Sequence, residues 1–235
     1  MSGIIVALDL PSSTDAIDLV DELGDVISFY KVGSPLYTLA GPGVIHELRE
    51  RGKDVFLDLK FHDIPSTVAR AVEAAATLDV QLVTLHAGGG TAMMKAAVQA
   101  AGGGGPKLLG VTILTSFTPA EVEAVWDKEV RSVRDEVVRL AALAAEAGLQ
   151  GVVTSPLEAE ALRRRHGPDF LIVTPGIRLE DEAPGDQART ATPAGAVRAG
   201  ADYLVIGRPI LNAPDRRAAA EAIRSEVEGV PQATG

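Results

Sequence analysis

The sequence contains no cysteine, which excludes disulfide bonds, thiolate nucleophiles and metal sites built on cysteine. Its four histidines are scattered and lack the paired spacing of a zinc site. No apolar run reaches the roughly 18 residues that a membrane span needs. Met1 is followed almost at once by the apolar stretch 4–8, without the pattern of a signal peptide. We therefore expect no metal site, no membrane association and a cytoplasmic location.

Positive charge is also scarce, because 22 lysines and arginines stand against 32 aspartates and glutamates, a formal net charge of -10. A negative field over the whole protein argues against nucleic acid as a partner. It still allows local arginines to bind a small phosphorylated molecule. A length of 235 residues with 46% hydrophobic residues suits one domain with a sizeable core, which we expect to span residues 1–235.

Short β-branched runs alternate with longer amphipathic stretches along the whole chain, a pattern that predicts a parallel sheet. Eight such runs favour an α/β fold of the closed (β/α)₈ TIM-barrel type in a single domain. The predicted strands are Ile4–Leu10, Val26–Val32, Asp54–Lys60, Val80–His86, Lys107–Leu114, Gly151–Thr154, Phe170–Thr174 and Tyr203–Gly207. The predicted helices are Thr14–Leu23, Ser66–Thr77, Thr91–Ala101, Arg131–Ala147, Leu157–His166, Ala194–Ala199 and Ala213–Glu228.

Polar side chains follow seven of these eight strands, at the barrel end where active sites of this fold lie. They converge if the barrel closes, which is a stronger signal than any one motif. Taken alone, Asp9 could cap the first helix and Lys31 could be a surface lysine. We interpret His86 as a structural histidine, the commoner role for a lone residue of this type. The strand-end residues are Asp9, Lys31, Asp58, Lys60, His86, Thr115, Pro175, Arg178, Gly207 and Arg208.

The densest charged cluster comes directly after the apolar run 55–57 and comprises Asp58, Lys60 and Asp63. Side chains alternate along a strand, so Asp58 and Lys60 are expected to point the same way, into the barrel mouth. Buried charges are costly unless they are paired. We therefore interpret the cluster as part of a catalytic site.

Two glycine–arginine segments follow the last two strands, where barrels of this type usually bind phosphate. They are Gly176-Ile-Arg178 and Gly207-Arg208-Pro209. An arginine offers a bidentate fork suited to phosphate oxygens, and the glycine exposes backbone N–H groups. The sequence therefore predicts a small phosphorylated substrate. The long polar stretch 176–192 is predicted to be an active-site lid.

These motifs resemble those of the orotidine 5′-phosphate decarboxylase family, and the match covers nearly the whole chain. The segments that carry it are Ala7–Asp9, Tyr30–Gly33, Asp58–Pro65, Thr84–Ala87, Val173–Arg178 and Tyr203–Pro209. The resemblance implies decarboxylation of orotidine 5′-monophosphate to UMP and CO₂, the last step of UMP biosynthesis. It also implies a homodimer with shared active sites and a reaction without metal or organic cofactor.

The resemblance further implies a role for each matching residue. Lys60 corresponds to the proton donor to C6, and Asp58 to the carboxylate beside the substrate's own carboxylate. Asp63 completes an alternating network with Lys31, Asp58 and Lys60. The substrate-binding set comprises Asp9, Lys31, Asp58, Thr67, Thr115, Pro175, Arg178, Gln187, Gly207 and Arg208. Within that set, Thr115 is placed at the pyrimidine, and Gln187, Gly207 and Arg208 at the phosphate with Arg178 beside them.

Two of these residues, Asp63 and Thr67, correspond to positions that reach across the dimer interface into the partner's site. One position departs from the family, because Ser66 stands where the family often has asparagine after Ile-Pro. We predict that Ser66 caps the helix that begins there, as asparagine would.

Three alternatives remain open on the sequence. A magnesium-dependent sugar-phosphate decarboxylase of the same barrel group shares the Asp-x-Lys-x-x-Asp strand, although Lys31 stands where those relatives carry an acid. A catalytically silent nucleotide-binding barrel is disfavoured because Lys60 and both aspartates are present. A Schiff-base aldolase using Lys60 is disfavoured because flanking carboxylates hold the lysine charged.

Overall fold

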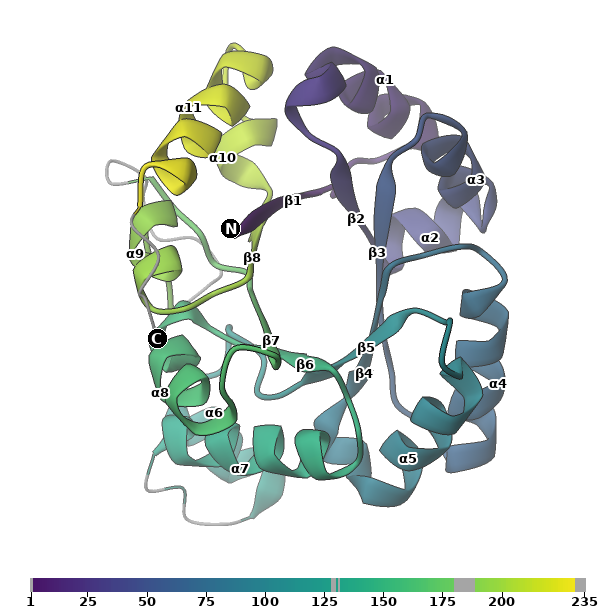
Figure 1. Cartoon of the computed structure of the whole chain (residues 1–235), viewed down its shortest axis with the longest axis vertical. Helices are drawn as coiled ribbons and strands as arrows, with labels where there is room; N and C mark the ends of the chain where they lie inside the picture. The colour runs from purple at the N-terminus through teal and green to yellow at the C-terminus, as the bar shows by residue number, and fades with distance from the viewer. Residues whose placement is uncertain (1, 128–129, 131, 180–188, 231–235) are drawn as a thin grey trace.

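Eight parallel strands close into a barrel in the order β1 to β8, and helices surround it (Figure 1). The computed structural model describes residues 2–127, 130, 132–179 and 189–230. Each strand pairs with the strands next to it in the sequence, and β1 pairs with β8 to complete the ring. The predicted single-domain α/β barrel is therefore confirmed. Within the described residues, no helix is long and apolar enough to span a membrane.

All eight predicted strands are present, with shorter bounds at several ends. The second prediction starts too early, because Gly24–Val26 forms the 3-10 helix η1 before the strand begins. The predicted ends at Leu10 and Leu114 are too late, because these residues have left the sheet for the loops above the barrel. The strands are β1 Gly3–Ala7, β2 Phe29–Gly33, β3 Asp54–Phe61, β4 Leu82–His86, β5 Lys107–Val111, β6 Gly151–Val153, β7 Leu171–Thr174 and β8 Tyr203–Ile206.

The seven predicted helices are also present, at α1 Ser13–Leu23, α4 Pro65–Ala76, α5 Gly90–Ala101, α7 Val133–Glu146, α8 Pro156–His166, α9 Pro193–Arg198 and α11 Arg216–Glu228. The sequence did not reveal four shorter ones, α2 Ser34–Ala40, α3 Gly43–Glu50, α6 Pro119–Trp126 and α10 Arg208–Leu211, nor the 3-10 helix η2 Ala87–Gly89. Eight or fewer residues give too few turns for an apolar periodicity to stand out.

Helix starts follow local capping chemistry, with one correction to the prediction. Ser12 caps α1, since its hydroxyl accepts the N–H of Asp15 at 3.0 Å. Ser66 does not cap α4. Pro65 occupies the first helical position, which its fixed backbone angle favours, so Ser66 lies inside the first turn and the N-cap is Ile64.

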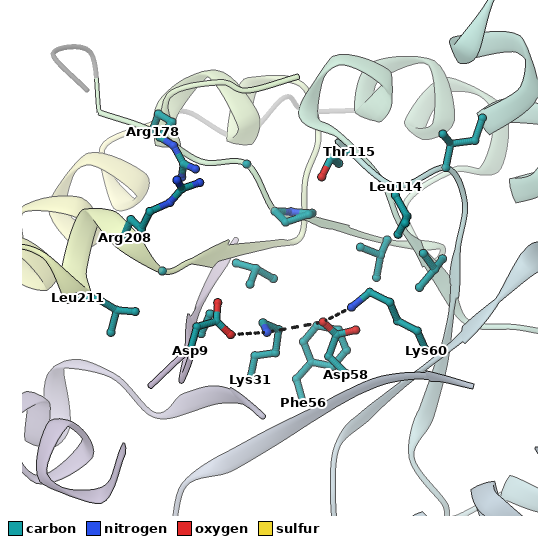
Figure 2. Close-up of a pocket in the computed structure, with 18 of the residues that line it drawn as sticks. Asp9, Lys31, Phe56, Asp58, Lys60, Leu114, Thr115, Arg178, Arg208 and Leu211 are labelled. Atoms are coloured by element: carbon teal, nitrogen blue, oxygen red, sulfur yellow. Dashed lines mark hydrogen bonds and ion pairs between the residues drawn. The ribbon is translucent and has the colours of Figure 1, made fainter. Parts of the chain in front are cut away.

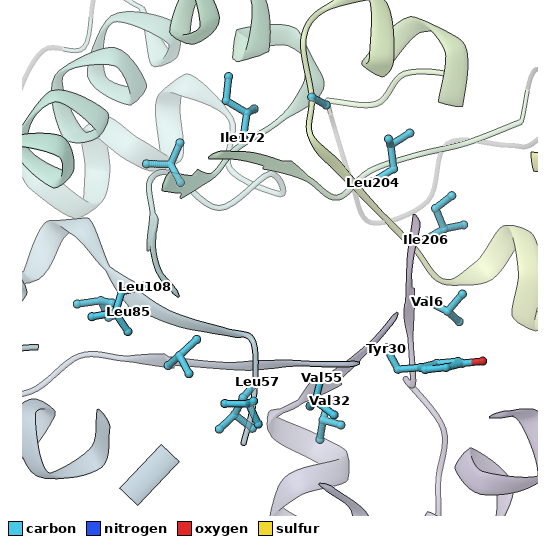
Figure 3. Close-up of a cluster of buried hydrophobic side chains, with 14 of the residues drawn as sticks. Val6, Tyr30, Val32, Val55, Leu57, Leu85, Leu108, Ile172, Leu204 and Ile206 are labelled. Carbon is cyan, nitrogen blue, oxygen red and sulfur yellow. The ribbon is translucent and has the colours of Figure 1, made fainter. Parts of the chain in front are cut away.

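The strands contribute to two apolar cores, one on each face of the closed sheet. The inner core fills the barrel with Ile5, Ala7, Phe29, Phe56, Leu82, Leu109, Val173 and Val205. The outer core packs the opposite faces of the strands against the helices, as Figure 3 shows for side chains such as Val6, Leu57 and Ile172. Successive residues along each strand therefore point alternately into the barrel and out toward the helices. The positions that point inward end in polar residues at the barrel mouth.

Candidate active site

A cavity of about 520 Å³ opens at the carboxyl ends of the strands. Charged side chains line it from two sides and apolar ones between them (Figure 2). Nine of the twelve predicted site residues line it, namely Asp9, Lys31, Asp58, Lys60, Thr115, Pro175, Arg178, Gly207 and Arg208. The sequence did not single out the other lining residues, which include Phe56, Ile113, Leu114, Leu211 and Asn212. The cavity has the place and the size of a small-molecule site.

Four side chains form a continuous series of ion pairs along one wall, which we call the charged chain: Asp9, Lys31, Asp58 and Lys60. Lys31 Nζ lies 3.1 Å from Asp9 Oδ1 and 3.7 Å from Asp58 Oδ2. Lys60 Nζ lies 2.8 Å from the same Asp58 Oδ2. Negative and positive groups alternate, and Figure 2 shows them side by side at the base of the cavity.

Asp58 is the buried member of the charged chain, with 8% of its surface exposed. Burial by itself would raise the pKa of its carboxyl group. The charges of Lys31 and Lys60, with hydrogen bonds from Lys60 and Thr84, outweigh burial and hold that pKa below its usual value. Asp58 is therefore a fixed negative charge at neutral pH.

Strand register explains how Lys31 reaches Asp58. Gly33 on β2 stands opposite Asp58 on β3, two residues beyond Lys31. A Cβ atom at Gly33 would lie 3.0 Å from Lys31 Nζ, tighter than side chains normally tolerate. Glycine at position 33 therefore leaves the space in which the ammonium group lies between its two carboxylates.

The geometry of Lys60 depends on a residue that the sequence analysis did not assign to the site. Lys60 has a backbone φ of +52°, uncommon for any residue with a side chain. Its N–H donates to the hydroxyl of Thr84 on β4 at 2.9 Å, and that hydroxyl donates to Asp58 Oδ1 at 2.9 Å. A polar residue inside the apolar run 82–85 was the only sequence signal for this role.

The opposite wall carries two arginines, Arg178 after β7 and Arg208 after β8, which we call the arginine end. Figure 2 shows their guanidinium groups turned toward each other across the cavity from Lys60. The backbone at Arg178 is held in place, because the N–H of Arg178 donates to Ala191 O at 3.0 Å. Two converging guanidinium groups favour an anion, and their forks suit phosphate oxygens.

Two of the predicted site residues that the structure describes, Asp63 and Thr67, do not line the cavity of this chain. Asp63 is exposed and its carboxylate accepts the N–H of Ile64 at 2.6 Å. Thr67 lies half-buried in the first turn of α4. Gln187 lies outside the described residues, as do residues 180–188 of the stretch predicted to be a lid.

His62 and His86, beside the charged chain, pack on each other with their ring centroids 5.2 Å apart. His86 is half-buried and does not line the cavity, in keeping with the structural role expected for it. Burial, and then electrostatic interactions with His62 and Lys60, hold the pKa of His86 below its usual value.

A buried ion pair that the sequence analysis missed supports the wall between the two charged regions. Arg189 Nη1 lies 2.6 Å from Glu158 Oε1, and the two side chains are 12% and 4% exposed. Arg189 Nη2 also donates to the backbone oxygens of Ile113 and Leu114, at 3.4 and 3.3 Å. Ile113 and Leu114 line the cavity, so this pair holds its apolar wall.

Comparison with known protein families gives a match over most of the chain. Residues 2–223 match the model of the family described as orotidine 5′-phosphate decarboxylase / HUMPS. An orotidine 5′-phosphate decarboxylase of Trichlorobacter lovleyi is 50% identical over 229 residues, 95% of this chain and 94% of that protein. One from Moorella thermoacetica is 48% identical over 234 residues, 97% of this chain and 92% of that protein.

Solved structures show the same relationship in three dimensions. The crystal structure of orotidine 5′-phosphate decarboxylase from Lactobacillus acidophilus superposes with a TM-score of 0.86 at 39% identity, covering 97% of this chain and 100% of that one. The enzyme of the same name from Pyrococcus horikoshii gives a TM-score of 0.77 at 28% identity, covering 97% of this chain and 100% of that one.

Proposed function

The chain belongs to the orotidine 5′-phosphate decarboxylase / HUMPS family, and on that premise we propose how its site converts orotidine 5′-monophosphate to UMP and CO₂. The activity is that of a carboxy-lyase in UMP biosynthesis. The observation that carries the mechanism is the charged chain, because it holds the Lys60 ammonium group at the cavity wall opposite two arginines.

The reaction breaks the bond between C6 of the pyrimidine and its carboxylate carbon. CO₂ leaves, and the electron pair of the broken bond stays on C6. A charge that develops at one carbon is best stabilised by a group already in place, since no water then has to reorganise. Lys60 Nζ supplies that positive charge and then transfers one proton to C6, which completes UMP.

Asp58 keeps Lys60 in place and faces the substrate's carboxylate. It is ionised at neutral pH for the reasons given above, so it fixes the ammonium group 2.8 Å away. Lys31 neutralises Asp58 from the other side and is itself paired with Asp9; family resemblance assigns these two residues to the ribose and nucleotide. Thr115 and Pro175 line the intervening wall, where the pyrimidine lies.

The arginine end binds the 5′-phosphate. Arg208 and Gly207 at the end of β8, with Arg178 after β7, lie across the cavity from Lys60. Binding energy from a phosphate remote from C6 lowers the barrier only if it aligns the reacting part of the substrate. Gln187 is assigned to the same phosphate by family resemblance.

The active form is a homodimer in which Asp63 and Thr67 complete the partner's site. Asp63 is exposed at the mouth of this chain's barrel. Beside it Ile64 is 63% exposed, and Leu39 on α2 is 68% exposed. Large apolar side chains exposed to solvent favour a contact with a second copy of the chain. The protein is proposed to work in the cytoplasm without metal or organic cofactor.

The magnesium-dependent sugar-phosphate decarboxylase remains the rival within this group of barrels. A magnesium site needs several oxygen ligands, usually carboxylates. Among the described residues, no group of three histidine, aspartate or glutamate side chains is arranged to hold a metal ion. Lys31 lies on β2 and is paired with Asp58, and Asp58 is therefore paired with two lysines.

The test is an absorbance assay for loss of orotidine 5′-monophosphate. We expect wild type to be active with or without EDTA, and Lys60→Ala to lose turnover while still binding UMP in calorimetry. Lys107→Ala is the matched control, because Lys107 is exposed at the opposite end of the barrel. Near-normal turnover by Lys60→Ala contradicts the assignment of Lys60. Loss of activity in EDTA with recovery in Mg²⁺ favours the rival.

A further inference from the structure

The pairing between β3 and β4 is irregular at the catalytic segment. Leu57 pairs with Val83, and the next pair is Phe61 with Leu85. Three residues of β3, 58–60, therefore stand opposite the single residue Thr84. Such a bulge leaves backbone groups without ladder partners and redirects the side chains within it.

Thr84 compensates for this irregularity with its side chain. Its surface is 0% exposed, and it does not line the cavity. Its one hydroxyl accepts the backbone N–H of Lys60 and donates to Asp58 Oδ1, both at 2.9 Å. The same hydroxyl therefore fixes the backbone of one catalytic residue and the carboxylate of the other.

The two bonds control different parts of the site. The bond to Lys60 holds a left-handed backbone, with φ of +52°, that a lysine adopts only under constraint. The bond to Asp58 occupies Oδ1 and leaves Oδ2 for the ammonium groups of Lys60 and Lys31, at 2.8 and 3.7 Å. Without the hydroxyl, the Asp58 carboxylate could rotate and the Lys60 backbone could relax.

We propose that Thr84 is a positioning residue for decarboxylation, which aligns Asp58 and Lys60 through a single shared hydroxyl group. The proposal rests on the proposed function of Asp58 and Lys60. It adds a residue that touches neither the cavity nor the substrate. Its effect must therefore appear in the chemical step and in the ionisation of Asp58 rather than in substrate affinity.

The critical pair of variants is Thr84→Val, which keeps the shape and removes the hydroxyl, and Thr84→Ser, which keeps the hydroxyl. For Thr84→Val we expect kcat to fall roughly 100-fold, because small displacements of reacting groups cost about that much. KM should stay within about twofold of the wild-type value. Thr84→Ser should restore most of kcat.

The pH profile gives a second readout that a merely structural role would not change. The hydrogen bond from Thr84 is one of the causes that lower the pKa of Asp58. The acid limb of kcat should therefore move to higher pH in Thr84→Val. The other titratable groups that face Asp58 are Lys31 from β2, Lys60 from β3 and His86 from β4, and the substitution retains all three.

Thr174→Val is the matched control. Thr174 is equally buried in β7 and does not line the cavity, and within the described part of the chain its hydroxyl donates to Tyr203 O at 3.4 Å and not to a predicted site residue. It should lower stability without moving kcat or the acid limb. If Thr84→Val does not fold, Thr84→Cys carries the test, since its thiol is a weak donor and should give a smaller loss in the same direction.

Two outcomes overturn the proposal. One is a folded Thr84→Val enzyme with wild-type kcat and acid limb, and the other is Thr84→Ser as impaired as Thr84→Val, which would assign the effect to packing of the methyl group. Failure of the proposed function looks different, because wild type itself would not consume orotidine 5′-monophosphate, or Lys60→Ala would remain active.

Discussion

The charged chain and the arginine end lie on opposite sides of one cavity and differ in how their charged groups are arranged. The charged chain alternates carboxylates with ammonium groups, so each lysine has a carboxylate within 4 Å. The arginine end brings two groups of the same sign together. The forks of the two guanidinium groups suit the oxygens of one phosphate group.

The difference separates catalysis from binding. Opposite charges that neutralise each other are in place before the substrate arrives, which is the condition for stabilising a charge as it develops. Two converging guanidinium groups instead offer several N–H donors to the oxygens of a phosphorylated ligand. Damage to the charged chain should therefore appear mainly in kcat, as for Lys60→Ala, and damage to the arginine end mainly in KM.

The largest effect expected at the arginine end is that of Arg208→Ala. Loss of its hydrogen bonds to phosphate should raise KM about 10- to 100-fold, since hydrogen bonds to charged groups contribute about 1.5–3 kcal/mol each. Steady-state kinetics with orotidine 5′-monophosphate measures this change. Arg217→Ala is the control, because Arg217 pairs with Glu221 on the surface of α11. A large fall in kcat at unchanged KM would remove the distinction between the two ends.

The residues of the charged chain were largely predictable from the sequence, whereas the interactions that hold them in place were not. Asp58 and Lys60 end an apolar run, and strand alternation places them on one side, so local sequence sufficed. Their exact geometry departs from that expectation, because the bulge and the left-handed backbone at Lys60 depend on the register of β4. Register is a property of two strands together, and Thr84 lies 24 residues away from Lys60.

The apolar wall of the cavity also depends on contacts between residues far apart in the sequence, which sequence patterns do not reveal. The bond between Arg189 and Leu114 O joins residues 75 positions apart, and it exists only because the barrel closes. In the sequence, Arg189 follows a polar stretch and Glu158 lies in a helix rich in charge, so neither was distinguishable from a surface residue. The order of the strands was predictable because it follows from the βα repeat, whereas pairs of side chains across the barrel were not.

Glu158→Gln tests whether the wall between the two ends depends on its buried ion pair. The change leaves the Arg189 guanidinium buried without its carboxylate, so the free energy of unfolding should fall by about 3 kcal/mol. Glu160→Gln on the same helix is the control: Glu160 is 67% exposed and lies 3.7 Å from Arg164, so its loss should cost under about 0.5 kcal/mol. Urea unfolding measures both, and equal values would contradict the role of the buried pair.

Acid pH should produce the smallest effect and should act on Asp58 of the charged chain and on the neighbouring His86 rather than on the arginine end, since arginine does not titrate in this range. Asp58 has a lowered pKa, so its contribution to stability is complete above its usual value of 3.8 and is lost as the pH falls through the lowered pKa. His86 also has a lowered pKa, so it favours the folded state while neutral, and that contribution declines as the pH falls below 6.5.

The melting temperature should therefore fall in two steps, the first from His86 together with His166, whose pKa burial also lowers, and the second from Asp58. His86→Gln should reduce the first step and leave the second. Asp58→Asn should remove the second and leave the first, although it lowers stability at neutral pH because two lysines lose their shared carboxylate. Melting curves from pH 8 downward measure both steps. If the melting temperature of His86→Gln still falls by the wild-type amount just below pH 6.5, groups other than His86 cause that fall. The acid sensitivity would then no longer distinguish the surroundings of the charged chain from the arginine end.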